Sequence, residues 1–368
     1  MKLRSLQASG YRSLRDIDLD LAEVNLFVGE NGVGKSNLYR ALQLMQAAAT
    51  GRLAEEIAAE GGMGSALWAG PHRKTEAARI ALSAELLDEQ SAVTFRYRVE
   101  AGLRPPQAAA GFALEPQIKE EELSVKTGRR PVTMMRRKGP GVFVRDEAGR
   151  MGDYPQAALT SETALALLGD AGHYPEVGTV RRLLERWRFF HGFRTDRDSP
   201  LRRPCLAVTA PLLAEDGANL AAVFATLSVT REDTTELDAA IAAALKGARL
   251  VIPEPLESAA FGLMLPEFPR RTFEPRELSD GQLRFLALAG ALLSYRRPPL
   301  IALNEPEASL HPDMLAPLAS LIAEAARESQ IWVVTHSQRL ATEIAARTYA
   351  QSWRVLREDG ATRVVPAH

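Results

Sequence analysis

The stretch Gly29-Glu-Asn-Gly-Val-Gly-Lys-Ser36 fits the phosphate-binding pattern G-x-x-x-x-G-K-[ST] at every fixed position. The apolar run Asn25-Leu-Phe-Val28 before it predicts a buried strand, and apolar residues from Leu38 to Met45 recur at helical spacing after it. A loop in this setting wraps a phosphate with its backbone N–H groups. We therefore expect a nucleoside triphosphate ligand, with Lys35 on the β- and γ-phosphates and Ser36 on Mg²⁺.

Length and composition describe an ordinary globular protein. The chain has 368 residues, of which 46% are hydrophobic and 25% charged. A formal net charge of −1 excludes a protein that coats nucleic acid by bulk charge, although it leaves room for a local basic strip. The single cysteine, Cys205, excludes an internal disulfide framework and a cysteine-based zinc site.

Nothing in the sequence predicts a membrane segment. The longest apolar run in a helical region, Phe285 to Leu293, is about half of the roughly 20 residues that cross a bilayer. The N-terminus carries charges every few residues instead of a signal-peptide core. We expect a cytoplasmic protein with no membrane partner.

The first hundred residues predict a sheet. Residues 1 to 28 alternate polar and apolar side chains, which indicates two or three strands before the phosphate loop. Ala78 to Leu87 and Val93 to Val99 predict two further strands. Arg12 and Ser13 fall at a turn, where they either contact the nucleotide at its edge or face solvent; the spacing does not separate these two interpretations.

Residues 101 to 270 are too long a connection for one compact domain, so we expect an inserted lobe with structure of its own. The predicted domains are therefore an N-terminal part of the head (residues 1–100), the lobe (101–270) and a C-terminal part of the head (271–368). Within the lobe the pattern predicts strands over Phe112 to Val144 and helices over Val177 to Phe190, Ala218 to Leu227 and Thr235 to Leu245.

Two groups of basic residues lie in the middle of the chain. They are either a strip for nucleic-acid phosphates or a solvated face, and the acidic residues within the second group favour the solvated face there. The first group is Lys126, Arg129, Arg130, Arg136, Arg137, Lys138 and Arg145, and the second is Arg181, Arg182, Arg186, Arg188, Arg194, Arg197, Arg202 and Arg203.

The last hundred residues predict the other half of a nucleotide site. Ser279 and Gly281 precede an apolar helix, and a helix N-terminus suits an anion. The apolar strand from Pro299 ends in Asn304-Glu305, the usual form of a strand end that handles metal and water in phosphate-loop enzymes. His336 stands at the end of a second apolar strand, where ligands bind in open α/β sheets.

The order of these motifs resembles the ABC-type ATPases of the SMC/RecF group. The chain is most similar to the bacterial predicted AAA ATPases related to the ATPase part of OLD-family proteins. The resemblance rests on the phosphate loop, Leu-Ser-x-Gly-Gln, Asn-Glu-Pro-Glu-x-x-Leu-His-Pro and Thr-His-Ser. It implies an α/β fold: an ABC/RecF-like P-loop NTPase head with an inserted α+β lobe.

The resemblance also implies roles for single residues. Lys35 and Ser36 would form the Walker A site, and Asn304 and Glu305 the Walker B end, with Glu305 as general base and His336 as switch histidine. Ser279 and Gly281 would form the signature that binds the γ-phosphate of a partner subunit. The loop Ala308 to His311 would meet that subunit, and no glutamine can be placed as the Q-loop residue. The catalytic candidates are Lys35, Glu305 and His336; the metal candidates are Ser36 and Asn304; the nucleotide-binding candidates are Arg12, Ser13, Gly29, Asn31, Gly32, Gly34, Lys35, Ser36, Asn37, Ser279, Gly281 and Gln282.

Two features depart from the family pattern. Asn304 stands where the family usually has Asp, which removes a negative charge, so we expect weaker Mg²⁺ binding and slow hydrolysis. OLD proteins carry a C-terminal TOPRIM nuclease, whereas this chain ends soon after His336. Any nuclease is therefore expected to be a separate protein.

Three functional hypotheses follow. The first is an ATPase that uses ATP and Mg²⁺, forms a homodimer on ATP binding, and serves DNA maintenance or anti-phage defence with DNA or a separate nuclease or effector protein. The second is an ATP-gated scaffold with little turnover that binds a protein partner. The third, a nucleotide-binding subunit of a transporter, is disfavoured because the span from Ser36 to Ser279 is much longer than those subunits use.

Overall fold

A computed structural model describes residues 1–71, 78–104, 111–154, 158–168 and 173–367. The chain forms two compact units. Unit 1 contains Met1–Ala22, Gly29–Trp187 and Trp353–Ala367, whereas unit 2 contains Glu23–Val28 and Arg188–Ser352. Both units thus combine segments that are far apart in the sequence.

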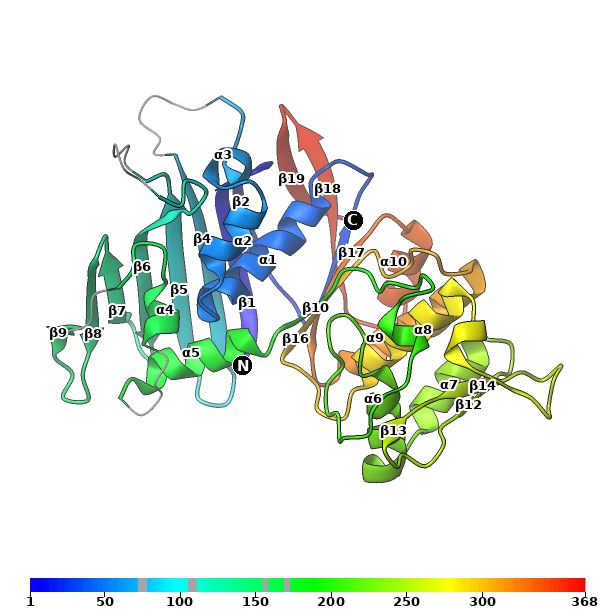
Figure 1. The fold of residues 1–368 in the computed structure, drawn as a ribbon. Coiled ribbons are helices and arrows are strands. Elements are labelled where there is room, and N and C mark those ends of the chain that lie inside the picture. The colour runs from blue at the N-terminus through cyan, green and yellow to red at the C-terminus, as the bar shows by residue number, and fades with distance from the viewer. Residues whose placement is uncertain (72–77, 105–110, 155–157, 169–172, 368) are drawn as a thin grey trace. The chain divides into compact units, whose positions relative to one another are not determined.

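Unit 1 is built on an antiparallel sheet of eight strands in the order β2-β1-β4-β5-β6-β7-β8-β9 (Figure 1). Apolar and charged side chains alternate along β5, as expected for a strand with one buried face: Phe95, Tyr97 and Val99 are buried while Arg96 and Arg98 are exposed. The strands are β1 (Lys2–Tyr11), β2 (Leu14–Asp20), β4 (Arg79–Asp88), β5 (Val93–Gly102), β6 (Gln117–Lys126), β7 (Val132–Lys138), β8 (Gly141–Arg145) and β9 (Met151–Asp153).

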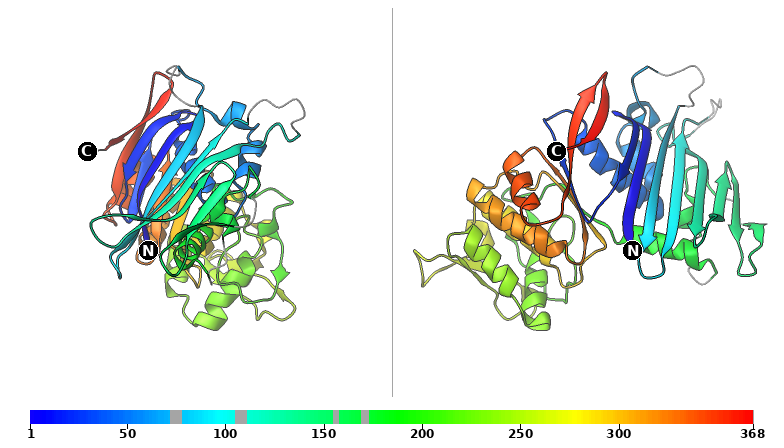
Figure 2. Two further views of the ribbon diagram at one scale, coloured as in Figure 1. Left: turned by 90° about the vertical axis from the view of Figure 1, so that its left-hand side faces the viewer. Right: turned by 180° about the vertical axis from the view of Figure 1, so that it is seen from behind.

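Helices cover one face of this sheet. Helix α1 contacts β1 and β4, and α4 and α5 contact β7. Seen from behind, the strands lie in front of these helices, so the opposite face is turned outward (Figure 2). The helices of the unit are α1 (Lys35–Ala49), α2 (Leu53–Ala59), α3 (Met63–Ala66), α4 (Ala164–Leu167) and α5 (Pro175–Glu185).

A hairpin from the end of the chain completes unit 1. It consists of β18 (Gln351–Glu358), which enters the unit at Trp353, and β19 (Ala361–Pro366). Strand β19 contacts β2. The first and last strands of the sequence therefore belong to the same unit.

The middle of the chain differs from the sequence prediction in two ways. The predicted limits at residues 100 and 270 do not coincide with the limits of the two units, because β6 pairs directly with β5 and extends the same sheet. The predicted helix from Val177 to Phe190 was wrong at its end, since α5 stops at Glu185 and Arg188–Phe190 form strand β10. A short apolar run such as Phe189-Phe190 fits a helix and a strand equally well by periodicity.

Unit 2 is built on a parallel sheet in the order β10-β16-β17-β3. Its other strands are β16 (Leu300–Asn304), β17 (Gln330–Thr335) and β3 (Val24–Val28). Every residue of β16 and β17 is buried, which explains why both are continuous apolar runs in the sequence. Because the strands are parallel, their carboxyl ends lie along one edge of the sheet.

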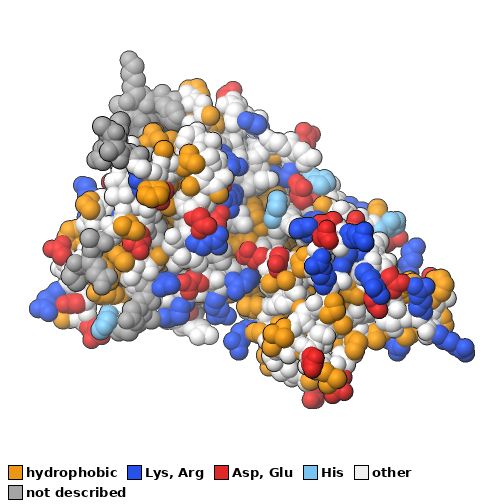
Figure 3. Space-filling model, in the orientation of Figure 1, with side chains coloured by type: hydrophobic (Ala, Val, Ile, Leu, Met, Phe, Trp, Pro, Cys, Tyr) orange, Lys and Arg blue, Asp and Glu red, His pale blue; other side chains and the backbone are white. Residues whose placement is uncertain are grey.

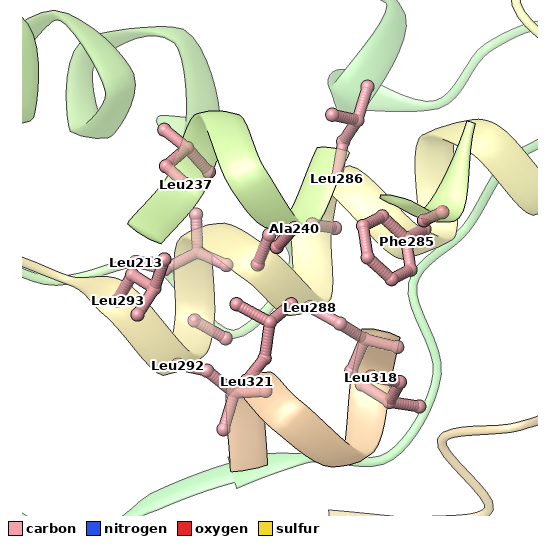
Figure 4. Packing of buried hydrophobic residues seen from close by; sticks show 14 of the residues in the cluster. Leu213, Leu237, Ala240, Phe285, Leu286, Leu288, Leu292, Leu293, Leu318 and Leu321 are labelled. Carbon is pink, nitrogen blue, oxygen red and sulfur yellow. The ribbon is translucent and has the colours of Figure 1, made fainter. Parts of the chain in front are cut away.

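Helices pack around that sheet to form the core of unit 2. Side chains of α7, α8 and α9 point toward one another, with Ala240, Leu288 and Leu321 at the centre of the contact (Figure 4). The helices are α6 (Leu220–Thr226), α7 (Thr235–Ala244), α8 (Asp280–Leu293), α9 (Leu315–Ala325) and α10 (Gln338–Ala345). Among the described residues, no helix has the length and apolar character needed to cross a membrane.

Short elements connect these parts of unit 2. Strands β12, β14 and β15 form a small antiparallel sheet, and β11 pairs with β13. The strands are β11 (Cys205–Leu206), β12 (Arg249–Val251), β13 (Ser258–Ala259), β14 (Gly262–Met264) and β15 (Thr272–Phe273); the helical turns are η1 (Pro200–Arg202), η2 (Leu227–Arg231), η3 (Pro275–Glu277) and η4 (Pro312–Met314).

Candidate functional site

The phosphate loop of unit 1 opens directly into α1. Gly34 precedes the helix with φ of 101°, a left-handed conformation that glycine adopts without strain. A Cβ at Gly34 would lie 1.9 Å from the hydroxyl of Thr362, so the position also requires glycine for space. Within the described residues no side chain caps α1, which leaves the helix N-terminus open to an anion.

Lys35 lies inside this loop. The residue is only 4% exposed, and its ammonium donates to the carbonyls of Gly29 at 2.7 Å and Glu30 at 2.6 Å. The next residue, Ser36, is exposed on the first turn of α1, as are Asn31 and Gly32 in the loop. The loop therefore presents a buried cation and an accessible hydroxyl, the two groups that the motif requires.

A chain of hydroxyl and amide groups braces the loop. Asn37 donates to the Ser13 hydroxyl at 2.7 Å, the Ser13 and Thr362 hydroxyls lie 2.6 Å apart, and the Thr362 hydroxyl donates to the carbonyl of Val33 at 2.9 Å. Arg357 donates to the carbonyl of Gly32 at 3.1 Å. Ser13 is thus buried and supports the phosphate loop. The sequence analysis offered only a contact to nucleotide or a position in solvent, and neither includes this role. Thr362 and Arg357 were not predicted.

A cavity of about 430 Å³ lies beside the loop in unit 1. Arg12, Asn37, Trp68 and Arg357 line it together with glycines of the loop. Arg12 has a φ of 47° and pairs with Glu60 at 2.9 Å, which fixes its backbone and its side chain. The cavity has the size and the aromatic and basic lining that suit the sugar and base of a nucleotide.

The signature segment caps helix α8 of unit 2. Ser279 accepts from the N–H of Gln282 at 3.3 Å, and the Gln282 side chain accepts from the N–H of Ser279 at 2.9 Å. This confirms that Ser279 lies at a helix N-terminus. A Cβ at Gly281 would lie 2.8 Å from the carbonyl of Ser309, so the loop predicted to meet a partner packs closely on the signature helix of its own chain.

Arg202 holds the segment that leads into the signature. Its guanidinium donates to the carbonyls of Pro275, Arg276 and Leu278 and pairs with Asp280 at 2.9 Å. Other members of the second basic group also have acidic partners, each within its own unit. These pairs are Arg181 with Glu185, Arg194 with Asp196, and Arg203 with Asp198.

Asn304 ends strand β16 and is 3% exposed. Its amide nitrogen lies 2.7 Å from Nδ1 of His191, the residue that follows β10 at the same edge of the sheet. Its amide oxygen is buried and has no hydrogen-bond partner in the described part of the chain. His191 was not predicted, because its strand is three residues long and was assigned to a helix.

Glu305 and His336 lie side by side in unit 2. Nδ1 of His336 is 3.8 Å from the nearer carboxylate oxygen of Glu305. Glu305 has a φ of 47°, and Arg284 of α8 donates to its carbonyl at 2.9 Å. The neighbouring residue Glu307 is closer still to His336, at 3.3 Å.

Each unit offers one oxygen donor of the kind that a hard divalent cation accepts, directly or through water. In unit 2 the amide oxygen of Asn304 is buried without a hydrogen-bond partner among the described residues, and in unit 1 Ser36 is exposed at the start of α1. The described residues contain no cluster of three or more His, Cys, Asp or Glu side chains that could hold a metal. A cation here would therefore depend on phosphate oxygens and water for most of its ligands.

The residues of the first basic group differ in their exposure, so they cannot all contact a ligand. Arg137 is 1% exposed, and its guanidinium donates to the carbonyls of Gly139, Leu159 and Glu162, so it serves the fold and cannot contact a phosphate. Burial lowers the pKa of Arg137. Basic and acidic side chains are interspersed over the face seen in Figure 3. Lys126, Arg129, Arg130, Arg136 and Lys138 remain exposed.

Parts of the sequence match curated transport ATPases. The chain is 38% identical over 90 residues, 24% of its length, to the thiamine import ATP-binding protein ThiQ of Chelativorans sp. (strain BNC1). It is 32% identical over 97 residues, 26% of its length, to the L-cystine transport system ATP-binding protein TcyN of Escherichia coli (strain K12). The matches span 36% and 38% of those two proteins.

Solved structures match the whole chain. An SMC head bound to the C-terminal winged-helix domain of ScpA gives a TM-score of 0.57 at 15% identity, with 100% of this chain and 98% of the other covered. The SMC head domain from Thermotoga maritima gives 0.51 at 15% identity, with both chains covered completely. At these identities the match shows the fold, which is that of an ABC-type P-loop ATPase.

A protein family matches residues 24–342, from the strand before the phosphate loop to the helix after His336. The family is described as "AAA domain, putative AbiEii toxin, Type IV TA system". Together with the relatives and the fold, this match confirms the predicted ABC/SMC-like P-loop ATPase group; the specific relation to OLD proteins stays a prediction. The chain belongs to this AAA-domain family.

Proposed function

We propose that this protein binds ATP with Mg²⁺, dimerises when ATP is bound, and hydrolyses the ATP slowly. The observation that carries the proposal is the pair of Glu305 and His336, 3.8 Å apart, at the carboxyl ends of the parallel strands of unit 2. Strand β3 of the same sheet ends at Val28, and the phosphate loop begins at the next residue. Ligands of open α/β sheets bind beyond this edge.

Each residue has a distinct task in this proposal. The loop and Lys35 bind the phosphates, and Ser36 and Asn304 hold Mg²⁺, which would balance the phosphate charge when bound. Glu305 accepts the proton of the attacking water, and His336 orients that water or the γ-phosphate. A phosphate-release assay of the wild type with Mg²⁺ and ATP tests the whole proposal.

The second candidate is an ATP-gated scaffold with little turnover. Asn304 favours it, because a neutral amide at this position removes one negative charge from the metal site. ATP binding without phosphate release in the assay would support the scaffold, whereas release that depends on Mg²⁺ would support the ATPase.

We further propose DNA, or a separate nuclease, as the partner in DNA maintenance or anti-phage defence. The exposed cations of the first basic group support this proposal. Arg137 no longer counts among them, because it is buried. A gel shift with and without ATP tests DNA as the ligand, and a salt-dependent shift is the expected signature of phosphate contacts.

Asn304→Asp is expected to raise Mg²⁺-dependent hydrolysis and to lower the Mg²⁺ concentration at half-maximal rate by about tenfold, the equivalent of about 1.4 kcal/mol. The reason is the added charge beside the cation. Because Asn304 donates to His191, a carboxylate would need a donor there instead, and the imidazole can supply one from Nδ1. Titration of the rate with Mg²⁺ measures the effect, and an unchanged titration would place residue 304 away from the metal.

Ser279→Arg is expected to block ATP-dependent dimerisation while ATP binding to the monomer stays nearly unchanged. In a two-fold dimer each chain offers its phosphate loop and its signature to the other, so ATP binds the dimer better than the monomer. Light scattering with Mg²⁺ and a slowly hydrolysed ATP analogue measures the assembly.

Ser320→Arg, at an exposed serine of α9 in the same unit, is the control for the added bulk and charge. The control should still dimerise. A wild type that stays monomeric at high concentration with the analogue, or a Ser279→Arg variant that dimerises like the wild type, would contradict the dimer model.

A further inference from the structure

Glu307 is a buried carboxylate that lies two residues after Glu305. Its side chain is 6% exposed in unit 2. One oxygen, Oε1, accepts from the hydroxyl of Thr335, from the N–H of His336 at 3.1 Å and from the N–H of Ser337 at 3.2 Å. A single carboxylate oxygen therefore binds three consecutive residues at the end of β17.

The same oxygen also faces the imidazole of His336. Nδ1 of His336 is 3.3 Å from Oε1 of Glu307, compared with 3.8 Å from Oε1 of Glu305. Glu307 is thus the nearer carboxylate to the switch histidine, although Glu305 is the proposed base. The contact fixes both the backbone and the ring of His336.

Helix capping does not account for this arrangement. Helix α10 begins at Gln338, and the Ser337 side chain already caps it by accepting from the N–H of Leu340 at 3.2 Å. The bonds from Glu307 go instead to the residues before the helix. They hold the strand end and the histidine, which is where the chemistry is proposed to occur.

A cation of the signature helix binds the segment that carries this carboxylate. Arg284 of α8 donates to the carbonyl of Glu305, and burial lowers its pKa while the charge of Glu307, followed by that of Glu305, opposes this effect. Nε of Arg284 and Oε2 of Glu307 are both buried and have no hydrogen-bond partner in the described residues. The bond from Arg284 to the carbonyl of Glu305 therefore ties the signature helix to the segment that carries Glu307.

We propose that Glu307 is a positioning residue for ATP hydrolysis: it holds His336 at the reacting end of the sheet, and through Arg284 it couples the signature helix to that histidine. This inference rests on the proposed ATPase function. It assigns a role to a residue that the sequence motifs left without one, and it makes the histidine's position depend on a helix that also carries the signature.

Glu307→Ala is expected to lower kcat about tenfold to a hundredfold with little change in KM for ATP, since small misplacement of a catalytic group has effects of this size. Glu307→Gln keeps a carbonyl oxygen for the N–H groups and is expected to retain a larger part of kcat. A phosphate-release assay over a range of ATP concentrations separates kcat from KM.

Glu324→Ala is the matched control. Glu324 of α9 pairs with the buried side chain of Arg297, which precedes β16, so its loss should destabilise unit 2 without touching the carboxyl ends of the strands. Per folded molecule, this control should keep the wild-type kcat. Normal kcat in both Glu307 variants would overturn the proposal, and so would an equal loss of kcat in Glu324→Ala.

A second measurement keeps the test independent of turnover. The imidazole signal of His336, assigned by comparison with His336→Gln, should shift in NMR spectra of Glu307→Ala but not of Glu324→Ala. If the wild type releases no phosphate, the proposed ATPase function fails, while this signal still tests the positioning. An unmoved signal would overturn the positioning role.

The coupling to the signature helix has its own test. Arg284→Gln should also lower kcat, and the double variant with Glu307→Ala should fall little further than the worse single variant, because the two residues act in one network. Losses that multiply in the double variant would show two independent effects and would remove Arg284 from the proposal.

Discussion

Replacing Lys35 with Met is expected to weaken ATP binding by about a hundredfold or more. Met keeps most of the volume of this buried side chain, so the change removes chiefly the ammonium. Charge-assisted hydrogen bonds are worth about 1.5 to 3 kcal/mol each, and about 2.8 kcal/mol corresponds to a hundredfold. Titration with a fluorescent ATP analogue measures the affinity.

The same variant loses the two bonds from Lys35 to the loop carbonyls of Gly29 and Glu30. The loop itself is therefore also expected to lose order, which adds to the effect on affinity. Lys138→Met, at an exposed lysine of β7, is the control for a lost positive charge. Wild-type affinity in Lys35→Met would contradict nucleotide binding by this loop, and with it the proposed function.

Replacing Glu305 with Gln is expected to lower turnover by about a hundredfold to ten-thousandfold while ATP stays bound. The amide can still orient a water molecule, but it cannot take the proton. The positive φ at residue 305 costs the same for both side chains, so the backbone should not change. Single-turnover phosphate release, measured beside ATP affinity, separates chemistry from binding.

The variant should also accumulate the ATP-bound dimer, since hydrolysis no longer ends that state. Glu343→Gln on α10 is the control for a lost carboxylate, because among the described ion pairs Glu343 pairs only with Arg347, just after that helix. Wild-type turnover in Glu305→Gln would mean that another group accepts the proton.

Local patterns predicted the parts of the site that are continuous in sequence. The phosphate loop, the helix N-terminus at Ser279 and the strand ends at Asn304 and His336 are each set by a few neighbouring residues. A glycine-rich turn, a capping box and an apolar run followed by polar residues are all visible in a single segment. The structure confirms these elements, while their roles in the reaction stay proposals.

Contacts between distant segments could not be predicted in this way. His191 meets Asn304 only because β10 and β16 are neighbours in a parallel sheet, and nothing in the local sequence marks that pairing. Arg137 looks like its exposed neighbours in the sequence, yet it points inward because side chains alternate along β7. The sequence motif contains Glu307 but does not indicate its role, because its hydrogen-bond partners lie at the end of another strand, β17.

The hairpin of β18 and β19 affects the order in which parts of the protein fold during synthesis. Thr362 lies 349 residues after Ser13, yet both belong to the support of the phosphate loop. During synthesis the loop emerges early, but its support is complete only after Thr362 has been made. A nascent chain therefore carries an intact motif long before the support of its phosphate loop is complete, so the proposed ATP binding would report that β18 and β19 have folded onto unit 1.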